Sequence, residues 1–413
     1  MTTGLDSILE RVDAEEVAQL ALTLGNFDSP TGAEQEVASF LHGWLREHGF
    51  EPRVVGLLPE RPNLMAVLPG TGGGRSLLFN SHMDTAVWPG DPRVADPEDP
   101  IFHSAWREGD LLYGHGVMND KGPMAAWLVA AVALKEAGGQ LRGDIVLTMV
   151  SGEIGNEPVD EFQGLPYSGK DLGARYLAVH GGVADYALVA EATGFNLAWV
   201  EAGKSFCKIR LLGGRGLYTP FVGSDGGPSA IFKAAKILEA WEPWAAAYTA
   251  RHRYECEGGV VSPAVNIGAI RSGLPWAITR TPEVCELYVD VRTAPGQSAT
   301  ATVAEVRELL ERAGVEGEVE LFLHRPGHEA VGVQPLAEAV RSAHRHVFGS
   351  EPGLPSPPTT SMWRDTNVWN ELGVPAAMYG PGAGSGGGGV SVNVDDLHKA
   401  ALVYAGAAYE LCR

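Results

Sequence analysis

The sequence predicts an α/β protein with two parts. The first is a mixed, mostly parallel sheet with helices on both faces, and the second is a smaller ferredoxin-like α+β domain inserted into it. Short apolar strands alternate with helical segments through the first 201 residues, which is the order typical of a mostly parallel sheet. From about residue 202 the order becomes β-α-β-β-α-β, and this unit is complete within about 120 residues.

The chain opens with two predicted helices. Apolar residues recur at helical spacing near the N-terminus and again in residues 37–45, before a probable helix end at Gly49. The rhythm then changes to that of strands. Residues 63–70 and 76–86 flank a glycine-rich turn, so we expect them to form a hairpin or neighbouring strands.

A third helix is expected from Pro123 to Gly138, because proline is favoured at the first helical position. Residues 144–155 and 185–194 read as short buried strands that end in polar residues. In sheets of this kind, sites are built at the carboxyl ends of the strands. The polar residues that follow each strand are therefore the candidates for function.

The inserted domain is expected to span 202–325, which leaves a catalytic domain in two pieces, 1–201 and 326–413. Its first strand, 205–214, is a candidate edge strand through which a second copy could pair. The last helix of the chain is expected to be capped at Asp395 and Asp396. The glycine-rich run 382–389 reads as a loop between ordered elements.

Composition excludes several classes of function. The 413 residues include 31 Lys and Arg against 51 Asp and Glu, a net charge of −20 that argues against nucleic acid or an anionic membrane as partner. No signal core opens the chain, and no stretch approaches the roughly 18 apolar residues of a membrane span. Four widely spaced cysteines read as reduced thiols. We therefore expect a cytoplasmic protein that acts on a small molecule.

Two polar clusters follow the first strands. His82 and Asp84 share one side of an extended segment, so the carboxylate can orient the imidazole for a metal, although a surface histidine would give the same pattern. The glycine-rich turn 114–122 leads into a helix. Such a turn suits an anion or a shaped site, and an ordinary capping turn would use similar residues.

Two further clusters contain single carboxylates. Glu153 follows an apolar strand, where burial would raise its pKa toward neutrality and suit it to act as a general base. A helix cap or an ion pair is the alternative role for this residue. Glu191 follows the next strand and by itself indicates little.

Taken in this order, and with the inserted domain, these clusters resemble the family that includes aminoacylase, acetylornithine deacetylase, succinyl-diaminopimelate desuccinylase and carboxypeptidase G. The resemblance covers nearly the whole chain, including VNIG (265–268), DVR (290–292) and GVPAAMYGPG (373–382). It implies a zinc-peptidase-like catalytic domain, an inserted lid and dimerisation domain, and a homodimer.

The resemblance also implies two adjacent zinc ions bridged by an aspartate, with a glutamate base. By position, His82 matches a metal ligand, Asp84 its orienting partner, Glu153 the base, and Glu191 a ligand of the same metal as His82. Other positions depart from the pattern. The bridging position holds the neutral Asn119, and a ligand position holds Ile154.

The C-terminal histidine ligand is also missing, because its expected segment, 385–393, contains no histidine and His398 comes too late. We therefore expect at most one divalent metal ion, zinc or manganese, or none. Asp120 or His115 could replace a lost ligand. Tyr218 stands where the family's inserted domain usually contributes a histidine to the partner subunit's oxyanion.

These positions predict a hydrolase that cleaves the C–N bond of a small acylated amino acid or related amide, with Glu153 activating water. Asn266 and Arg292 would position a carboxylate, and Tyr218 would donate to the developing oxyanion. Lys121 and Asn119 would contact substrate.

Two alternatives stay open at this point. One is a metal-independent acid–base enzyme, such as an isomerase, lyase or amide-forming enzyme, and the other is a non-catalytic ligand-binding homologue. Specificity is expected to reside in the loops 382–389 and 158–182.

Overall fold

The computed structural model describes residues 4–138, 141–223, 227–382 and 390–413. The chain divides into two compact units. The main unit comprises Met1–Trp199, Ala330–Thr359 and Arg364–Arg413, and the inserted unit comprises Val200–Glu329 and Thr360–Trp363. Among the described residues, no helix is both long and apolar enough to cross a membrane.

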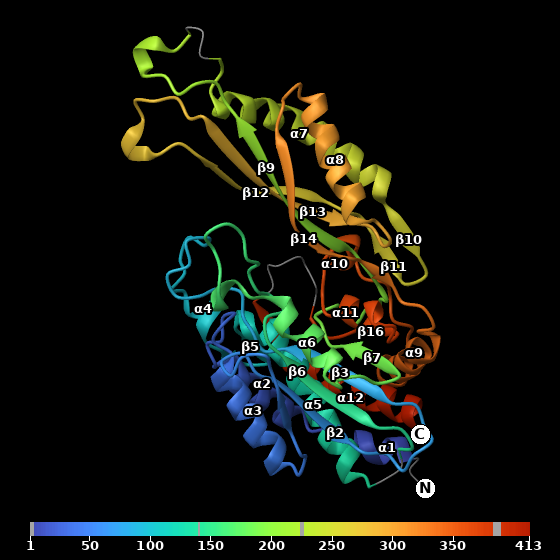
Figure 1. The fold of residues 1–413 in the computed structure, drawn as a ribbon. Coiled ribbons are helices and arrows are strands. Elements are labelled where there is room, and N and C mark those ends of the chain that lie inside the picture. The colour runs from blue at the N-terminus through green and yellow to red at the C-terminus, as the bar shows by residue number, and fades with distance from the viewer. Residues whose placement is uncertain (1–3, 139–140, 224–226, 383–389) are drawn as a thin grey trace. The chain divides into compact units, whose positions relative to one another are not determined.

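The main unit is built on a six-stranded mixed sheet (Figure 1). The strand order is β1 (Arg53–Val55), β2 (Asn63–Leu68), β6 (Ile145–Val150), β3 (Leu77–His82), β7 (Tyr186–Val189) and β16 (Ala376–Met378). The last four strands run parallel to one another, and β1 and β2 pair antiparallel. Every residue of β3 and β6 is buried, so both faces of the sheet are covered, and the predicted fold class is confirmed.

One expectation about this sheet is wrong. Strands β2 and β3 are not neighbours, because β6 lies between them and pairs with both. Two apolar strands on either side of a short glycine-rich turn suggest a hairpin. In the structure, β6 pairs antiparallel with β2 and parallel with β3, so the two strands that flank the turn each pair with β6 and not with one another.

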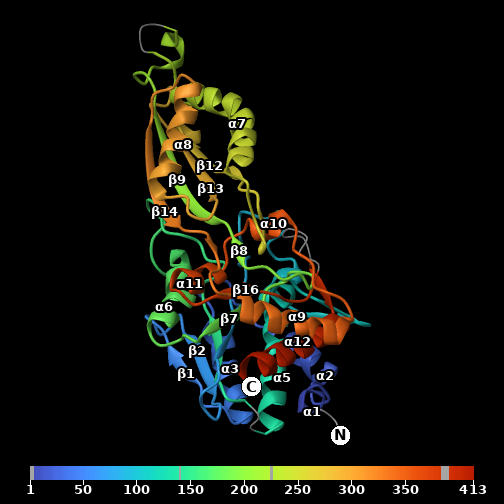
Figure 2. The same ribbon diagram turned by 90° about the vertical axis from the view of Figure 1, so that its right-hand side faces the viewer.

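A layer of long helices packs against the sheet. Helix α5 (Gly122–Glu136) is buried along nearly its whole length and packs on β3, α2 (Ala14–Gly25) and α12 (Val394–Cys412). Figure 2 shows α12 beside α9 (Gln334–Phe348), and these two helices are in contact. The main unit also contains α1 (Gly4–Leu9), α3 (Gln35–Glu47), α4 (Pro100–His103), α6 (Ala174–Val179), α10 (Pro357–Thr360) and α11 (Thr366–Glu371). Three short helical turns, η1 (Val117–Lys121), η2 (Leu165–Tyr167) and η3 (Lys170–Leu172), and a small sheet of β17 (Ser391–Asn393), β5 (Leu111–Tyr113) and β4 (Trp106–Glu108) accompany them.

Helix boundaries follow local capping. Helix α5 begins at Gly122, with Pro123 in its first turn, as expected from the proline. The N-cap of α12 is Asn393, whose side chain accepts a hydrogen bond from the backbone NH of Asp395, and Asp395 and Asp396 lie in the first turn. The glycine-rich run 382–389 lies, apart from its first residue, outside the described residues.

The inserted unit has the predicted β-α-β-β-α-β order. Its antiparallel sheet is ordered β12 (Val265–Ser272), β13 (Val284–Thr293), β9 (Gly203–Leu212) and β14 (Glu318–Arg325), and it packs against α7 (Ala230–His252) and α8 (Ala299–Arg312). Strand β13 alternates between buried and half-buried residues, as expected when one face of a sheet packs on helices. Two short pairs complete the unit: β10 (Tyr254–Cys256) with β11 (Gly259–Val261), and β8 (Val200–Glu201) with β15 (His328–Glu329).

The expectation that residues 205–214 form an edge strand is also wrong. Residues 205–212 belong to β9, which lies between β13 and β14 and pairs with both of them. The apolar side chains of Cys207, Ile209 and Leu211 are fully buried, so this strand belongs to the centre of the sheet. The edges of the sheet are β12 and β14.

Candidate metal and catalytic site

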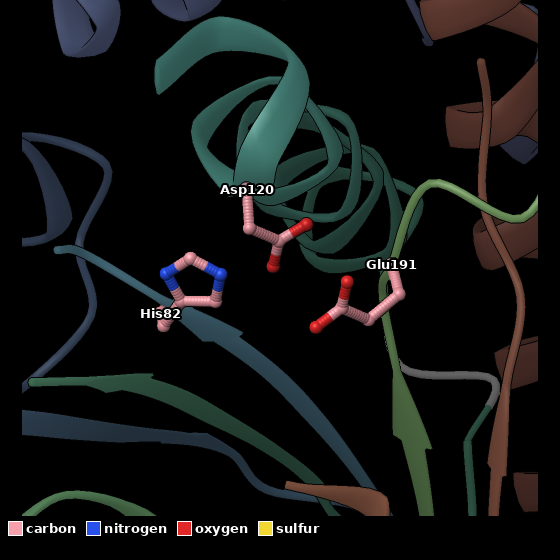
Figure 3. Close-up of side chains that lie close together, drawn as sticks. All are labelled: His82, Asp120 and Glu191. Atoms are coloured by element: carbon pink, nitrogen blue, oxygen red, sulfur yellow. The ribbon is translucent and has the colours of Figure 1, made fainter. Parts of the chain in front are cut away.

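Three acid and imidazole side chains converge at one edge of the main sheet. His82 is the last residue of β3, Glu191 lies two residues beyond β7, and Asp120 lies in the turn before α5. Because β3 and β7 are parallel neighbours, their carboxyl ends meet at the same edge. One ligand atom from each of His82, Asp120 and Glu191 lies within 4.8 Å of the other two (Figure 3).

This cluster has the chemistry of a cation site. All three side chains are buried, and neither carboxylate oxygen of Asp120 has a hydrogen-bond partner among the described residues. Burial and the nearby charge of Glu191 raise the pKa of Asp120 well above its usual value. Figure 3 shows the carboxylates of Asp120 and Glu191 facing each other, with the His82 ring beside Asp120. A nitrogen and two carboxylates fit one divalent ion such as zinc or manganese, which would satisfy the unpartnered carboxylate.

Asp84 orients the imidazole of His82. Nδ1 of His82 lies 3.0 Å from the Asp84 carbonyl oxygen and 3.4 Å from Oδ1 of Asp84, so this nitrogen donates to Asp84 and fixes the orientation of the ring. The Asp84 carboxylate also accepts backbone hydrogen bonds from Glu153 and Ile154, each at 2.9 Å. Burial opposes the ionisation of Asp84, but the hydrogen bond and charge of His82, the amide of Ile154 and the charge of Lys170 lower its pKa to about 2.

The turn before α5 brings Asp120, rather than Asn119, into the three-residue cluster. Oδ1 of Asn119 lies 3.2 Å from Nε2 of His82 and offers only a neutral oxygen. Of the two residues that could replace a lost ligand, Asp120 and His115, the cluster contains Asp120. The ring of His115, the other candidate replacement, packs against Phe102 with 5.9 Å between centroids, and His115 is not part of the cluster.

Glu153 lies beyond the end of β6, and its side chain forms a buried ion pair. Nζ of Lys170 donates a hydrogen bond to Oε1 of Glu153. The expectation that burial raises the pKa of Glu153 toward neutrality is wrong. Burial does oppose ionisation, but the charges of Lys170 and His82 outweigh it and hold the pKa of Glu153 below its usual value. Glu153 is consequently an ionised carboxylate at neutral pH.

A second buried cation accompanies Glu191. Nε of Arg364 lies 3.2 Å from Oε2 of Glu191, and Nη1 of Arg364 donates to the carbonyl oxygen of Thr359 at 2.7 Å. The adjacent Asp365 accepts a hydrogen bond from Asn80 at 3.0 Å, and burial together with the charge of Glu153 raises its pKa to about 7.

No sequence pattern points to Lys170, Arg364 or Asp365 as site residues. All three enter from segments without a recognisable motif. Only the segment 158–182, which contains Lys170, was singled out, and it was singled out for its position as a long loop rather than for its lysine.

Lys121 is fully buried, and its expected contact with substrate stays a prediction. Its Nζ donates a hydrogen bond to the carbonyl oxygen of Phe27 at 2.7 Å, and burial lowers its pKa to about 7. This contact ties the turn before α5 to the segment that follows α2. The structure thus gives Lys121 a role in holding the turn that carries Asp120.

The other three expected substrate residues belong to the inserted unit. Tyr218 is exposed, with its ring 5.3 Å from the guanidinium of Arg280. Asn266 of β12 lies opposite Asp290 of β13, and Arg292 donates to Oδ2 of Asp290 at 2.9 and 3.1 Å. The guanidinium of Arg292 is therefore engaged by a carboxylate of its own unit, and the roles of these residues toward substrate stay predictions.

Comparison with known proteins places this geometry in context. The sequence profile of Peptidase family M20/M25/M40 matches residues 78–410. The chain is 25% identical over 404 residues to N-formyl-4-amino-5-aminomethyl-2-methylpyrimidine deformylase of Bacillus subtilis (strain 168), covering 89% of this chain and 87% of that protein. It is 28% identical over 369 residues to acetylornithine deacetylase of Myxococcus xanthus, covering 86% of this chain and 85% of that protein.

Solved structures show the same fold. The aminopeptidase PepT from Bacillus cereus superposes with a TM-score of 0.71 at 20% identity, covering 98% of this chain and all of that one. An M20 family metallo-carboxypeptidase from Sulfolobus solfataricus superposes with a TM-score of 0.70 at 17% identity, covering 96% and 99% of the two chains.

Proposed function

The chain belongs to Peptidase family M20/M25/M40 and is a hydrolase acting on amide bonds, and on that premise we propose that it removes the acyl group from a small acylated amino acid or related N-acyl amine. The observation that carries this proposal is the buried, ionised carboxylate of Glu153, which lies at the same sheet edge as the cluster of His82, Asp120 and Glu191.

Glu153 is the general base of the proposed reaction. A general base must be unprotonated at the working pH, and the charges of Lys170 and His82 keep Glu153 in that form. Its carboxylate takes a proton from the attacking water and returns it to the nitrogen of the leaving amine. Asp84 keeps the ring of His82 in one orientation throughout, because its own charge persists far below neutral pH.

A divalent ion would be held by His82, Asp120 and Glu191, as the unpartnered oxygens of Asp120 indicate. When bound there, such an ion supplies Lewis-acid polarisation of the reacting groups. Asn119, beside Nε2 of His82, would contact the substrate with its side-chain amide.

The named relatives support the substrate class. They are called a deformylase, a deacetylase and, for partial matches, a desuccinylase, so the acyl group differs while an acylated amine is common to all. For this chain we accordingly propose an N-acyl amine without naming the acyl group. Within the inserted unit, Asn266 and Arg292 are proposed to position a substrate carboxylate, and Tyr218 to donate to the oxyanion.

We also propose that the chain acts as a homodimer in the cytoplasm. All four of its cysteines are free thiols, which is compatible with a reducing compartment. The inserted unit presents β12 as an edge strand, and Ile270 on this strand is half exposed. Unpaired edges of this kind invite strand pairing between chains.

The test is amine release from a panel of N-formyl, N-acetyl and N-succinyl amino acids. The full-length protein should release free amine from at least one class, and Glu153→Gln should lower kcat by at least about a hundredfold, in the range of general-base catalysis. Glu47→Gln, at an exposed end of α3, is the matched control and should leave kcat unchanged. Turnover of the panel to isomerised or condensed products, or full activity in Glu153→Gln, would contradict the proposal.

A further inference from the structure

Two buried cationic side chains accompany the acidic site. Lys170 and Arg364 are about 5% and 6% exposed, and each is paired with a carboxylate of the site, Glu153 and Glu191 respectively. Lysine and arginine are almost never this deeply buried unless they are paired. Both are therefore part of how the site balances its charge.

The site contains more carboxyl groups than cationic side chains, even with these two partners. Five buried carboxyl groups influence one another at this edge of the sheet: Asp84, Asp120, Glu153, Glu191 and Asp365. Neither carboxyl oxygen of Asp120 has a hydrogen-bond partner among the described residues, so both are available to a ligand. A buried polar group without a partner is costly, and one divalent ion at Asp120 would satisfy it.

A second divalent ion does not fit beside the first. The residue after Glu153 is Ile154, whose hydrocarbon side chain offers no ligand to a metal ion. Oε1 of Glu153 already accepts a hydrogen bond from the ammonium group of Lys170, and Oε2 of Glu191 faces the guanidinium of Arg364. A second ion would have to displace these cations or lie against them, where like charges repel in a medium of low polarity.

The loop that carries Lys170 is held in place by another buried ion pair, which Arg61 forms with Glu34. Arg61 is fully buried and is held by Glu34, with Nε of Arg61 2.8 Å from Oε2 and Nη2 2.9 Å from Oε1. Its Nη1 donates to the carbonyl oxygens of Leu165 and Ser168 at 3.1 and 2.7 Å.

Close backbone packing adds to this support. A Cβ on Gly155 would lie 2.7 Å from Cα of Gly169, so only glycine fits at position 155. The backbone at Gly155 therefore packs directly on the backbone at Gly169, next to Lys170. The position of Lys170 is therefore set by interior contacts rather than by an exposed loop.

We propose that Lys170 takes the place of a second metal cation, so that the site is complete with one divalent ion held by His82, Asp120 and Glu191. The ammonium group keeps Glu153 charged and in place, and Arg364 holds one oxygen of Glu191 while the other faces the ion. Lys170 is thus a positioning residue for the base. The inference rests on the proposed function only for the role of Glu153, since the metal content does not depend on the substrate.

The experiment measures metal content and affinity in the purified full-length protein. Elemental analysis after equilibration with Zn²⁺ or Mn²⁺ should find one ion per chain in the wild type; two ions, or none, would overturn the proposal. In titration calorimetry with Mn²⁺, Lys170→Met should bind the ion at least about tenfold more tightly or show a second binding event, because a repelling charge has been removed. Lys170→Arg should behave as the wild type.

Lys399→Met is the matched control, since it removes a lysine that pairs with Asp395 on the surface of α12, and it should leave metal binding unchanged. Unchanged Mn²⁺ affinity in a folded Lys170→Met protein would refute the replacement role. If Lys170→Met does not fold, the number of metal ions per chain in the wild type still tests whether the site is complete with one ion. Failure of amide hydrolysis with one bound ion would reject the proposed function alone, whereas hydrolysis with two bound ions would reject this inference alone.

Discussion

Nζ of Lys170 donates a hydrogen bond to Oε1 of Glu153, and less than a tenth of either side chain is exposed. The residues are 17 positions apart, on the end of β6 and on the loop that follows it. Together with the charge of His82, this contact lowers the pKa of the proposed base, so Glu153 is ionised at neutral pH. The ionisation of Glu153 therefore depends on Lys170, a residue of a loop whose position does not follow from the arrangement of the strands.

The pH dependence of activity should follow this ion pair. Lys170 and His82 hold the pKa of Glu153 below its usual value, and the base acts in its ionised form. Lys170→Met should therefore raise that pKa and move the acid limb of the kcat/KM profile to higher pH, by about one unit or more.

Lys170→Arg keeps the charge and should restore most of the original acid limb. A role of Lys170 in packing alone would lower the whole profile without moving its acid limb. An unmoved limb in Lys170→Met would thus separate a structural lysine from one that controls the base.

The two residues of the turn should differ in their effect on metal binding. Asp120 belongs to the three-residue cluster, whereas Asn119 only faces Nε2 of His82 with a neutral oxygen. Asp120→Asn should weaken Zn²⁺ or Mn²⁺ binding at least about tenfold, since an anionic ligand is lost. Asn119→Ala, measured by the same calorimetric titration, should change affinity much less. The reverse order would show that Asn119, at the position of the family's bridging aspartate, is the real ligand.

Breaking the ion pair between Arg61 and Glu34, which holds the loop that carries Lys170, should destabilise the protein. Arg61→Leu leaves Glu34 buried without its cation, and losing one partner of a buried ion pair typically costs about 3–5 kcal/mol. Denaturant unfolding followed by circular dichroism measures the loss. Arg53→Leu removes an exposed arginine from β1 and should stay within about 0.5 kcal/mol of the wild type. Equal stability of the two variants would contradict the anchoring role of Arg61.

Assembly through the inserted unit should be visible in solution. Light scattering at micromolar protein should give twice the 43.8 kDa mass of the chain. Ile270→Lys places a charge on the edge strand β12 and should shift the mass toward that of one chain. Val54→Lys, on the edge strand β1 of the main unit, should leave the mass unchanged. A wild-type mass of 43.8 kDa would rule out the dimer.

The fold class and four of the residues that meet at the sheet edge could be predicted from the amino-acid sequence alone. Alternation of apolar strands and helices predicts a mostly parallel sheet, and in such a sheet polar residues after β3, β6 and β7 must come to the same edge. His82, Asp84, Glu153 and Glu191 could be singled out for that reason, because their placement follows from local patterns and from the direction of the strands.

The order of the strands, the identity of the third cluster residue and the ion pairs of the site could not be predicted, because they depend on contacts between distant segments. Strand β3 pairs with β6, although many residues separate the two strands in the chain. The pattern of apolar residues identifies strands but does not show which strands pair. Whether Asn119 or Asp120 faces the cluster depends on the path of one turn. Lys170 and Arg364 reach their carboxylates from irregular loops, where pairing is set by packing between distant segments and leaves no periodic signal in the sequence.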